Sequence, residues 1–485
     1  MLFTSLTFIL CFLPTTLFVY YILLRSSRKL QNYFLLAASL FFYAWGEPLF
    51  VFVLIFSILG NWLLGFMIQR YRNRSSVAAM LAFNLGIIFV FKYLIFTVVN
   101  LNLWFGTGIP IPGIVLPIGI SFFTFQAISY GLDIYRGKAE AQKNLLHAGL
   151  YIAFFPELLS GPIIRYETMS RQIHNRKESP GLIVEGINRF LIGFCKKVLI
   201  ANNMALIADH CFRIAEEGGI TMTLAWLGAI AYTLQIYFDF SGYSDMAIGL
   251  GRMFGFVFPE NFNYPYISKS ASEFWRRWHI SLGSWFRDYV YIPLGGNREG
   301  RVRTYFNLLI VWSLTGFWHG ANWTFISWGL LWFLFISLEK SVNFEKKTHY
   351  RFAGNTKSSR YLMSLTKHLY AMLLIVVGWV IFRSESVESA IDYLSIMSGS
   401  GKVPFNDVRT LAWIKESLWF LIPAIAFSMP SGPMIGRSIN RKIALPSAAR
   451  AGISIVYSFG IILLFTVAVS YLVKGMHNPF IYFNF

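Results

Sequence analysis

Charged residues are scarce in this sequence. Of its 485 residues, 13% are Asp, Glu, Lys or Arg and 56% are hydrophobic, with a mean hydropathy of +0.54. A soluble domain carries charge on about a quarter of its residues. Long apolar runs in lipid are accommodated as helices, which satisfy their own backbone hydrogen bonds. The sequence therefore predicts an all-α polytopic membrane protein.

Cysteine and acidic residues are also few. The three cysteines, Cys11, Cys195 and Cys211, lie in or beside apolar runs, with the spacing of neither a disulfide framework nor a metal site. Lys and Arg number 42 against 23 Asp and Glu, a net charge of +19. Because the basic residues are scattered between apolar runs, they fit cytoplasmic loops. We expect no bound metal and no nucleic-acid partner.

Several motifs of pumps and soluble enzymes are absent. The sequence contains no Walker-type loop, no dinucleotide-binding glycine pattern, no HExxH and no GxSxG. These absences argue against nucleotide-driven transport and against a serine hydrolase. The first 24 residues lack a basic start and a small-residue cleavage site, so we expect a retained first span.

Basic residues between the apolar runs predict about eleven membrane spans, with both termini on the extracytoplasmic side. The run 145–164 contains Pro156 and Gly161-Pro162 and is predicted to be re-entrant. The run 182–212 carries Lys196-Lys197 in its middle and is predicted to be an interfacial helix followed by a span. The remaining spans are predicted over 2–24, 32–45, 50–68, 77–98, 115–135, 221–250, a hairpin within 304–340, 361–382, 418–435 and 452–473.

One histidine, His319, lies inside an apolar run that has basic residues at both ends. If both ends are cytoplasmic, this run is a hairpin with His319 near its tip. From Thr304 to His319 is about 22 Å of helix at ~1.5 Å per residue, well inside a hydrocarbon core of about 30 Å. An ionisable side chain at that depth is a candidate functional residue. A histidine that only hydrogen-bonds a helix backbone explains the pattern equally well.

The segment 262–303 is predicted to be a long cytoplasmic loop of basic and aromatic character. It contains Trp275, Arg276, Arg277, Trp278 and His279 in one cluster. Guanidinium groups bind phosphate and stack on aromatic rings, so a phosphate-bearing cytosolic cofactor such as coenzyme A suits this cluster. Ordinary anchoring of basic and tryptophan side chains at the membrane face is the alternative.

Two carboxylates, Asp239 and Asp245, interrupt the apolar run 221–250. Carboxylates within a span are expected to act as proton-relay groups or as partners of the arginines. A buried structural ion pair is the competing interpretation.

These pieces together resemble the membrane-bound O-acyltransferase family, in its bacterial branch that acetylates alginate. The matching segments are FxYAWGEP (41–48), LPIGISF (116–122), YFDFSGYSDMAIGLGRMFGF (237–256), PENFNYPYIS (259–268), EFWRRWHISLGSWFRDYVYIPLGGNR (273–298), GFWHGANW (316–323) and PFIYFNF (479–485). The resemblance implies a helical core around a central tunnel. The expected organisation is a single domain with N-terminal spans (1–145), a catalytic core (146–340), and C-terminal spans with an extracytoplasmic tail (341–485).

The resemblance also implies roles for individual residues. His319 corresponds to the catalytic histidine of the family and His279 to its second motif histidine. Neutral imidazole at His319 is expected to take the proton of the acceptor hydroxyl as it attacks a thioester. The expected donor-binding side chains are Arg276, Arg277, Trp275 and Trp278. The side chains expected to line or support the tunnel are Trp318, Asn322, Asp239, Tyr243 and Asp245.

The expected activity is transfer of acetyl groups from cytoplasmic acetyl-CoA across the bacterial inner membrane, for O-acetylation of an alginate-like exopolysaccharide or cell-envelope polymer. Acetyl-CoA is then a substrate, and no bound cofactor is expected. Because the chain has no large extracytoplasmic domain, a periplasmic serine-hydrolase-like acetyltransferase is expected to carry the group to the polysaccharide. Peptidoglycan O-acetylation and a non-enzymatic transporter or scaffold are the alternatives.

The C-terminal tail 478–485 is mostly apolar and aromatic and contains Tyr482. One interpretation is an aromatic residue anchored at the membrane interface. The other is a tail that folds back into the outer mouth of the tunnel, where Tyr482 accepts the acetyl group and passes it to the partner. A phenol, with a pKa near 10, leaves more readily than an alkanol.

Overall fold

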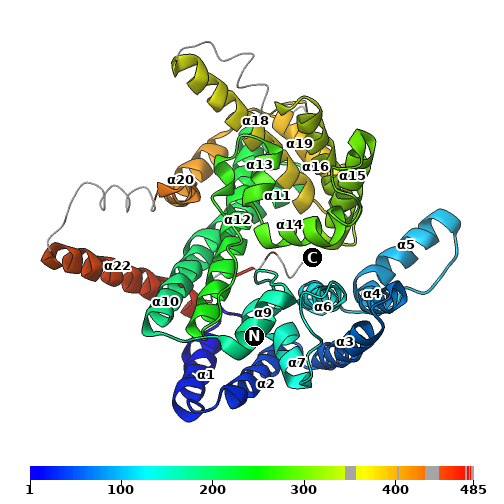
Figure 1. Cartoon of the computed structure of the whole chain (residues 1–485). Coiled ribbons are helices and arrows are strands. Elements are labelled where there is room, and N and C mark those ends of the chain that lie inside the picture. The colour runs from blue at the N-terminus through cyan, green and yellow to red at the C-terminus, as the bar shows by residue number, and fades with distance from the viewer. Residues whose placement is uncertain (345–356, 401–402, 432–446, 476–477, 480, 482–485) are drawn as a thin grey trace. The chain divides into compact units, whose positions relative to one another are not determined.

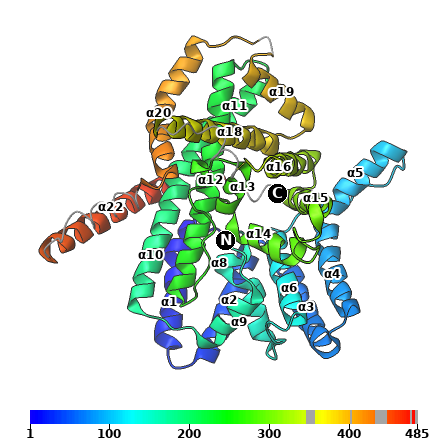
Figure 2. The same ribbon diagram turned by 45° about the horizontal axis from the view of Figure 1, so that its top comes forward.

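The computed structural model describes residues 1–485 except 345–356, 401–402, 432–446, 476–477, 480 and 482–485 (Figures 1 and 2). Within the described residues the regular structure is helical throughout and includes no strand. This confirms the predicted all-α fold. The chain forms two compact units, which interleave along the sequence. Unit 1 comprises Met1–Phe194 and Tyr243–Glu260, and unit 2 comprises Cys195–Gly242 and Asn261–Phe485. The predicted single-domain organisation stays a prediction.

The N-terminal helices of unit 1 overlap the predicted spans in position, and two of them, Val51–Tyr71 and Arg74–Phe105, are long and apolar enough to cross a membrane. The first span is α1 (Leu13–Phe18) between two π-helical turns, η1 (Phe8–Phe12) and η2 (Val19–Leu23). Ser27 and Asn73 each cap a following helix through a side-chain oxygen. The next helices are α2 (Arg28–Gly46), α3 (Val51–Tyr71), α4 (Arg74–Ile88), η3 (Phe89–Tyr93), α5 (Leu94–Phe105) and α6 (Ile120–Tyr135).

The start of α6 and the predicted re-entrant segment differ from a simple span. Helix α6 begins after Gly119, whose φ of 79° suits glycine, and a Cβ there would lie 2.7 Å from the carbonyl oxygen of Leu158. The run predicted to be re-entrant contains two short buried helices, α7 (Leu145–Ala153) and α8 (Phe155–Leu158). The break falls at Phe154, and Pro156 stands in the first turn of α8, where a proline is tolerated. Unit 1 also contains α9 (Tyr166–Asn175), which the hydropathy did not indicate.

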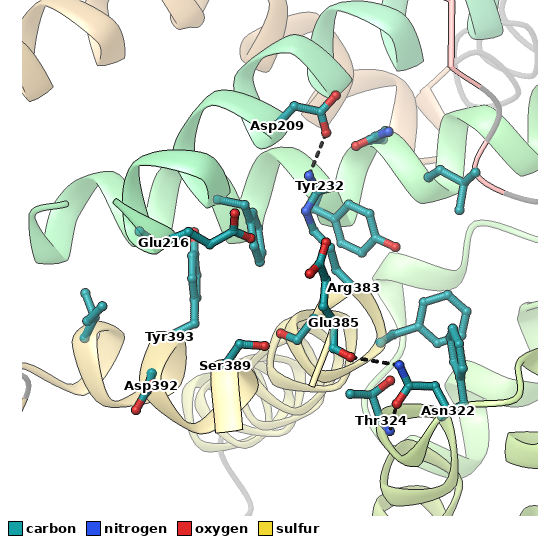
Figure 3. Close-up of a pocket in the computed structure, with 18 of the residues that line it drawn as sticks. Asp209, Glu216, Tyr232, Asn322, Thr324, Arg383, Glu385, Ser389, Asp392 and Tyr393 are labelled. Atoms are coloured by element: carbon teal, nitrogen blue, oxygen red, sulfur yellow. Dashed lines mark hydrogen bonds and ion pairs between the residues drawn. The ribbon is translucent and has the colours of Figure 1, made fainter. Parts of the chain in front are cut away.

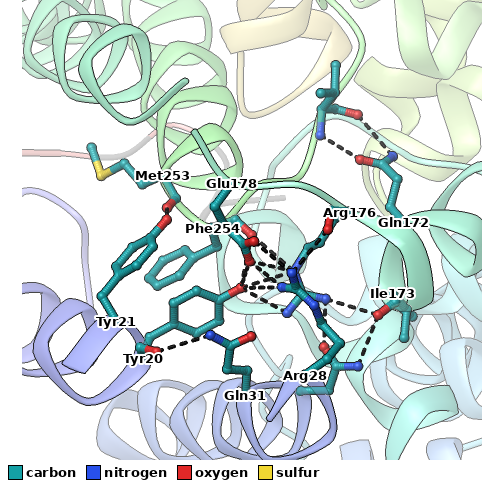
Figure 4. Close-up of polar contacts among 12 residues, drawn as sticks. Tyr20, Tyr21, Arg28, Gln31, Gln172, Ile173, Arg176, Glu178, Met253 and Phe254 are labelled. Atoms are coloured by element: carbon teal, nitrogen blue, oxygen red, sulfur yellow. Dashed lines mark hydrogen bonds and ion pairs between the residues drawn. The ribbon is translucent and has the colours of Figure 1, made fainter. Parts of the chain in front are cut away.

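A network of charged and polar side chains connects the segment that follows α9 to the rest of unit 1 (Figure 4). The fully buried guanidinium of Arg176 donates from Nε to the hydroxyl of Tyr20 and to the carbonyl oxygen of Phe254, both at 3.1 Å. Arg28 donates to Glu178 at 2.7 Å, and Tyr20 also donates to Glu178. Buried charges are stable only when paired in this way.

Unit 2 is built around a helix that was predicted to be interrupted. Helix α10 (Pro180–Cys195), which starts in unit 1, continues through the π-helical turn η4 (Lys196–Ala201) into α11 (Asn202–Glu216). The predicted separation into an interfacial helix and a span is therefore wrong. Lys197 does not interrupt the helix, because its ammonium is neutralised by Asp239 at 2.8 Å.

The later helices follow the predicted order with two corrections. The segment 262–303 is not an open loop, since it contains the short helices η5 (Pro265–Ile267), α13 (Ala271–Arg277) and α14 (Ile280–Phe286) and the π-helical turn η6 (Arg287–Tyr291). Helix α20 begins at Val408 rather than at 418, because Asp407 caps it by accepting from the N–H of Thr410 at 2.7 Å. The remaining helices are α12 (Met222–Met253), α15 (Gly300–His319), α16 (Trp323–Ser341), α18 (Lys357–Arg383), α19 (Val387–Ser398) and α22 (Ser447–Val473).

Among the described residues, 6 helices are long and apolar enough to cross a membrane. They are Val51–Tyr71, Arg74–Phe105, Pro180–Glu216, Ser358–Arg383, Val408–Ser428 and Gly452–Val473. The two helices of the hairpin, α15 and α16, are outside this set. The chain is a multi-pass membrane protein.

Candidate functional site

The site begins with the hairpin of α15 and α16, which lie side by side in Figures 1 and 2. Gly316 and Gly329 face each other where the two helices cross. A Cβ on Gly316 would lie 2.4 Å from the carbonyl oxygen of Phe325, and one on Gly329 would lie 2.5 Å from that of Trp312. Side chains therefore cannot stand at the crossing, and the two backbones approach closely. The predicted hairpin is confirmed, and it ends at His319.

His319 is the last residue of α15 and its side chain is buried, at 4% exposure. Aromatic rings enclose the imidazole: the ring centroids of Trp318, Trp328 and Phe382 lie 4.6, 4.9 and 5.1 Å away. Trp328 and Phe382 approach edge-on. These ring contacts hold the imidazole in one orientation.

His279 lies between α13 and α14 in a left-handed backbone conformation, with φ 44°. Such strain at a non-glycine residue costs on the order of 1–3 kcal/mol and is often found at functional sites. Burial lowers the pKa of His279 to about 3, so the ring is neutral. Its Nδ1 lies 3.1 Å from Oδ1 of Asn261, which also accepts from both the N–H and the hydroxyl of Ser281. We therefore assign the proton to Nδ1.

The other ring nitrogen of His279, Nε2, is buried and has no hydrogen-bond partner among the described residues. Trp318 contacts both histidines, with ring-centroid distances of 6.2 Å to His279 and 4.6 Å to His319. The predicted supporting residue Trp318 thus joins the two motif histidines through one indole ring.

Unit 2 contains a cavity of about 720 Å³, which His319 does not itself line (Figure 3). Phe382 forms part of its wall and contacts the His319 ring, while Asn322 caps α16 and donates to the carbonyl oxygen of Glu385 at 2.8 Å. Arg383 lies in the cavity, paired with Asp209 at 2.6 Å. The cavity is lined by Asp209, Phe212, Ala215, Glu216, Tyr232, Gln235, Asn322, Thr324, Phe325, Phe382, Arg383, Ser384, Glu385, Ser389, Asp392, Tyr393, Ile396, Pro479 and Ile481.

Sequence reasoning missed the polar side chains Gln235, Thr324 and Arg383 of this cavity. Gln235 stands one helical turn before Asp239, on the same face of α12. This position, at the start of the stretch that contains the family motif, was the signal in the sequence that could have identified Gln235. Thr324 and Arg383 gave none, because each stands at the end of an apolar helix where polar residues are common.

The C-terminal tail is fastened beside the cavity by buried charge. The N–H of Ile481 donates to Asp239 at 2.8 Å, and Lys197 donates to the carbonyl oxygen of Pro479. Asn202 donates to Asn478 at 3.1 Å. Asp239 thus holds a lysine and the tail rather than an arginine, while Pro479 and Ile481 line the cavity. Tyr482, the predicted relay residue, lies outside the described residues.

The predicted donor-binding side chains differ in exposure. Arg276 is exposed, and Arg277 pairs with Glu273 at 3.0 Å. Trp278 is buried among aromatic rings, 4.8 Å from Trp379 between centroids, and Trp275 packs 4.7 Å from Trp312. In this structure both tryptophans pack the core of unit 2, and their role in donor binding stays a prediction.

Tyr243 and Asp245 belong to unit 1. The Tyr243 ring stacks on Phe3 with centroids 4.7 Å apart. Asp245 pairs with Arg189 at 2.6 Å, and Arg189 also contacts Glu260. Asp245 is therefore the carboxylate that pairs with an arginine. Among the described residues, no group of three or more His, Cys, Asp or Glu side chains is arranged to hold a metal ion.

Comparison with known proteins places this arrangement in a family. The profile of the membrane-bound O-acyltransferase family matches residues 141–382, which include both motif histidines. A Pseudomonas putida protein described as a probable alginate O-acetylase, AlgI, is 38% identical over 505 residues, covering 100% of each chain. A similarly described protein of Pseudomonas syringae pv. tomato is 44% identical over 399 residues, 80% of this chain and 74% of that protein.

A more distant relative has a different named substrate. The peptidoglycan O-acetyltransferase of Helicobacter pylori is 31% identical over 532 residues, covering 100% of this chain and 98% of that protein. The names of these relatives share an O-acyl transfer. The chain therefore belongs to the membrane-bound O-acyltransferase family and is a multi-pass membrane O-acyltransferase.

Proposed function

We propose that this enzyme takes acetyl groups from cytoplasmic acetyl-CoA and passes them across the bacterial inner membrane for O-acetylation of an alginate-like polysaccharide. The observation that carries the proposal is the position of His319, buried at the tip of the α15–α16 hairpin and in contact with Phe382 of the cavity wall. The relatives described as alginate O-acetylases support the choice of acetyl group and polymer.

The reaction uses His319 as a general base. The acceptor oxygen attacks the acetyl carbonyl carbon while imidazole takes the hydroxyl proton. The carbon–sulfur bond then breaks, and the proton passes from His319 to the departing thiolate to give the free thiol of coenzyme A. His279 stays neutral at physiological pH, because burial lowers its pKa to about 3. It acts as a neutral hydrogen-bonding group through Nε2, not as a charge.

Donor binding is assigned to the cytoplasmic side of α13. Arg276 is exposed, and arginine binds phosphates such as those of coenzyme A well. Arg277 supports the same helix through its pair with Glu273. This assignment follows the positive-inside pattern of the sequence, which also puts both termini in the periplasm.

A periplasmic partner is proposed to complete the transfer. By resemblance this partner is a serine-hydrolase-like acetyltransferase, which holds the polysaccharide. Tyr482 is proposed to be the first acceptor: its hydroxyl oxygen attacks the thioester while His319 takes its proton, and the resulting acetyl-tyrosine is then cleaved as the partner's hydroxyl takes the acetyl group. The preceding residue, Ile481, is held beside the cavity by Asp239, which supports this role. Tyr482→Phe removes one oxygen, and unchanged polymer acetylation in that variant would leave Tyr482 as an anchor.

His319→Ala tests the central assignment. We expect a folded, membrane-inserted protein whose acetyl transfer from radiolabelled acetyl-CoA falls by at least two orders of magnitude. His210→Ala is the matched control, since His210 stacks on Trp413 in a different part of unit 2 and should tolerate the change. Normal polymer acetylation in cells that contain only the His319 variant would refute the assignment.

Peptidoglycan is the second candidate polymer. The Helicobacter pylori relative named for that substrate matches the full length of this chain. Comparing acetyl content of isolated peptidoglycan and of exopolysaccharide in cells with and without His319→Ala distinguishes the two. Loss of acetyl groups from peptidoglycan alone would replace alginate in the proposal.

A further inference from the structure

Two buried polar groups line this cavity, whose wall residue Phe382 contacts His319, and they lack hydrogen-bond partners among the described residues. Gln235 is 3% exposed and Thr324 is 0% exposed, and both line the cavity. Neither Oε1 of Gln235 nor Oγ1 of Thr324 has a partner among the described residues. A buried amide or hydroxyl without a partner costs about 1–3 kcal/mol, so such groups are usually satisfied. Their shared position in one cavity points to a ligand.

The chemistry of the pair specifies what it binds. The unpartnered Oε1 of Gln235 accepts hydrogen bonds, and the hydroxyl of Thr324 both donates and accepts them. Neither carries charge. The aromatic rings of Tyr232, Phe325 and Phe382 form nearby walls, which suit the apolar faces of a compact organic group. The pair is therefore suited to an uncharged group that bears a hydroxyl or an ester oxygen.

The rim of the cavity selects against anions. Four carboxylates line it, those of Asp209, Glu216, Glu385 and Asp392, and Arg383 is paired with Asp209. Glu216, Glu385 and Asp392 are exposed at the rim. Like charges repel over roughly 8 Å at physiological salt. A polymer of uronic acids brings one carboxylate per sugar, and coenzyme A brings several phosphate charges, so both are disfavoured in this cavity.

We propose that this cavity is the acceptor site, that it takes an uncharged hydroxyl-bearing group and excludes polyanions, and that Gln235 and Thr324 hold that group beside His319. The inference rests on the proposed function, because it assigns the acceptor of the same acetyl transfer. An anionic polysaccharide then receives its acetyl group from an intermediate carrier with a neutral hydroxyl, and does not itself reach His319.

Steady-state kinetics of the purified full-length enzyme test the two binding residues. The acceptors are methyl β-mannopyranoside, which is neutral, and its uronate analogue, with radiolabelled acetyl-CoA as donor. We expect acetylation of the neutral glycoside to exceed that of the uronate at least tenfold at low salt. Gln235→Met and Thr324→Val should raise the KM for the neutral glycoside at least fivefold and leave the KM for acetyl-CoA unchanged.

Three further measurements separate ligand binding from folding. Thr324→Ser, which keeps the hydroxyl, should restore the KM. Neither Gln235→Met nor Thr324→Val should lower the melting temperature, since each removes a buried group that has no partner. Ser417→Ala is the matched control, because its hydroxyl is also buried without a described partner but faces a different groove. Its KM should equal that of the wild type.

The charge filter is tested without turnover. In a cysteine-free background, Ser384→Cys places a thiol in the cavity wall. We expect a cationic methanethiosulfonate to react at least tenfold faster than an anionic one, after correction for their rates with a free thiol. Combined Glu216→Gln, Glu385→Gln and Asp392→Asn should abolish the preference.

The outcomes distinguish this inference from the proposed function. An inactive His319→Ala variant alongside wild-type acceptor KM in Gln235→Met and Thr324→Val would overturn only the inference. Acetylation of neither glycoside, equal acetylation of both, or equal reaction with the two thiol reagents would also overturn it. A fully active His319→Ala variant would overturn the proposed function.

Discussion

Lys197 and Asp239 form a buried ion pair at 2.8 Å, with side-chain exposures of 3% and 2%. The pair joins the continuous helix α10–η4–α11 to α12. It also organises the chain terminus, since Asp239 accepts from the N–H of Ile481 and Lys197 donates to Pro479. One pair of charges therefore fixes both the core of unit 2 and the tail beside the cavity.

Breaking this pair should destabilise the protein and release the tail. Lys197→Met leaves a buried carboxylate without its counter-ion, which costs about 3–5 kcal/mol. Thermal unfolding in detergent measures the loss of stability, and thiol labelling of Ile481→Cys measures release of the tail. The double variant Lys197→Met/Asp239→Leu should recover much of the stability, because two apolar groups can replace a buried pair. Equal stability of wild type and Lys197→Met would contradict the assignment.

Arg276 and Arg277 should affect the donor more than the chemistry. Arg276→Gln is expected to raise the KM for acetyl-CoA about tenfold, which corresponds to ~1.4 kcal/mol, with little change in kcat. Arg277→Gln should also lower stability, because Arg277 pairs with Glu273 and donates to the carbonyl oxygen of Asn263. Arg287→Gln, also an exposed arginine of the segment 262–303, is the control. Labelling of a cysteine at position 276 only from the periplasm would show that the topology is wrong.

Gly316→Ala should disturb the hairpin that presents His319. The added methyl would stand 2.4 Å from the carbonyl oxygen of Phe325, a backbone atom that cannot move aside by itself. Overpacking of this kind costs about 1–3 kcal/mol, so we expect a lower melting temperature and reduced acetyl transfer. Gly460→Ala is the matched control, since nothing lies within 4 Å of its added methyl. Equal behaviour of the two variants would argue against the close crossing.

His279 should make stability depend on pH. Burial lowers its pKa from the ordinary 6.5 to about 3, so between these values the unfolded chain binds the extra proton. Stability from this residue is therefore complete above pH 6.5 and falls as the pH is lowered toward 3, with a slope of up to about 1.4 kcal/mol per pH unit. His279→Gln removes the titrating group. The difference between the two unfolding curves across this range isolates His279, and parallel curves would disprove the effect.

The sequence by itself determined the helical membrane fold and the helical hairpin that presents His319. These features are local. An apolar run, a capping residue or a glycine pair predicts the structure of the segment that contains it. The same local information put His319 at the hairpin tip. Local information gave the wrong start for α20. The charged residues Arg409, Lys415 and Glu416 made its first turns look like a loop, although Asp407 caps the helix.

Only the tertiary structure decided the partners of the buried charges and the composition of the cavity. The tail contact between Ile481 and Asp239 joins residues 242 positions apart, and no periodicity encodes such a pairing. The sequence wrongly predicted that Lys197 interrupts a span, because the counter-ion of Lys197 lies on another helix and is not visible in the local pattern. Gln235, Thr324 and Arg383 likewise became a site only when α12, α16 and α18 came together. Ion pairs and hydrogen bonds join residues that are close in space but distant in sequence, so which groups pair depends on how the chain packs.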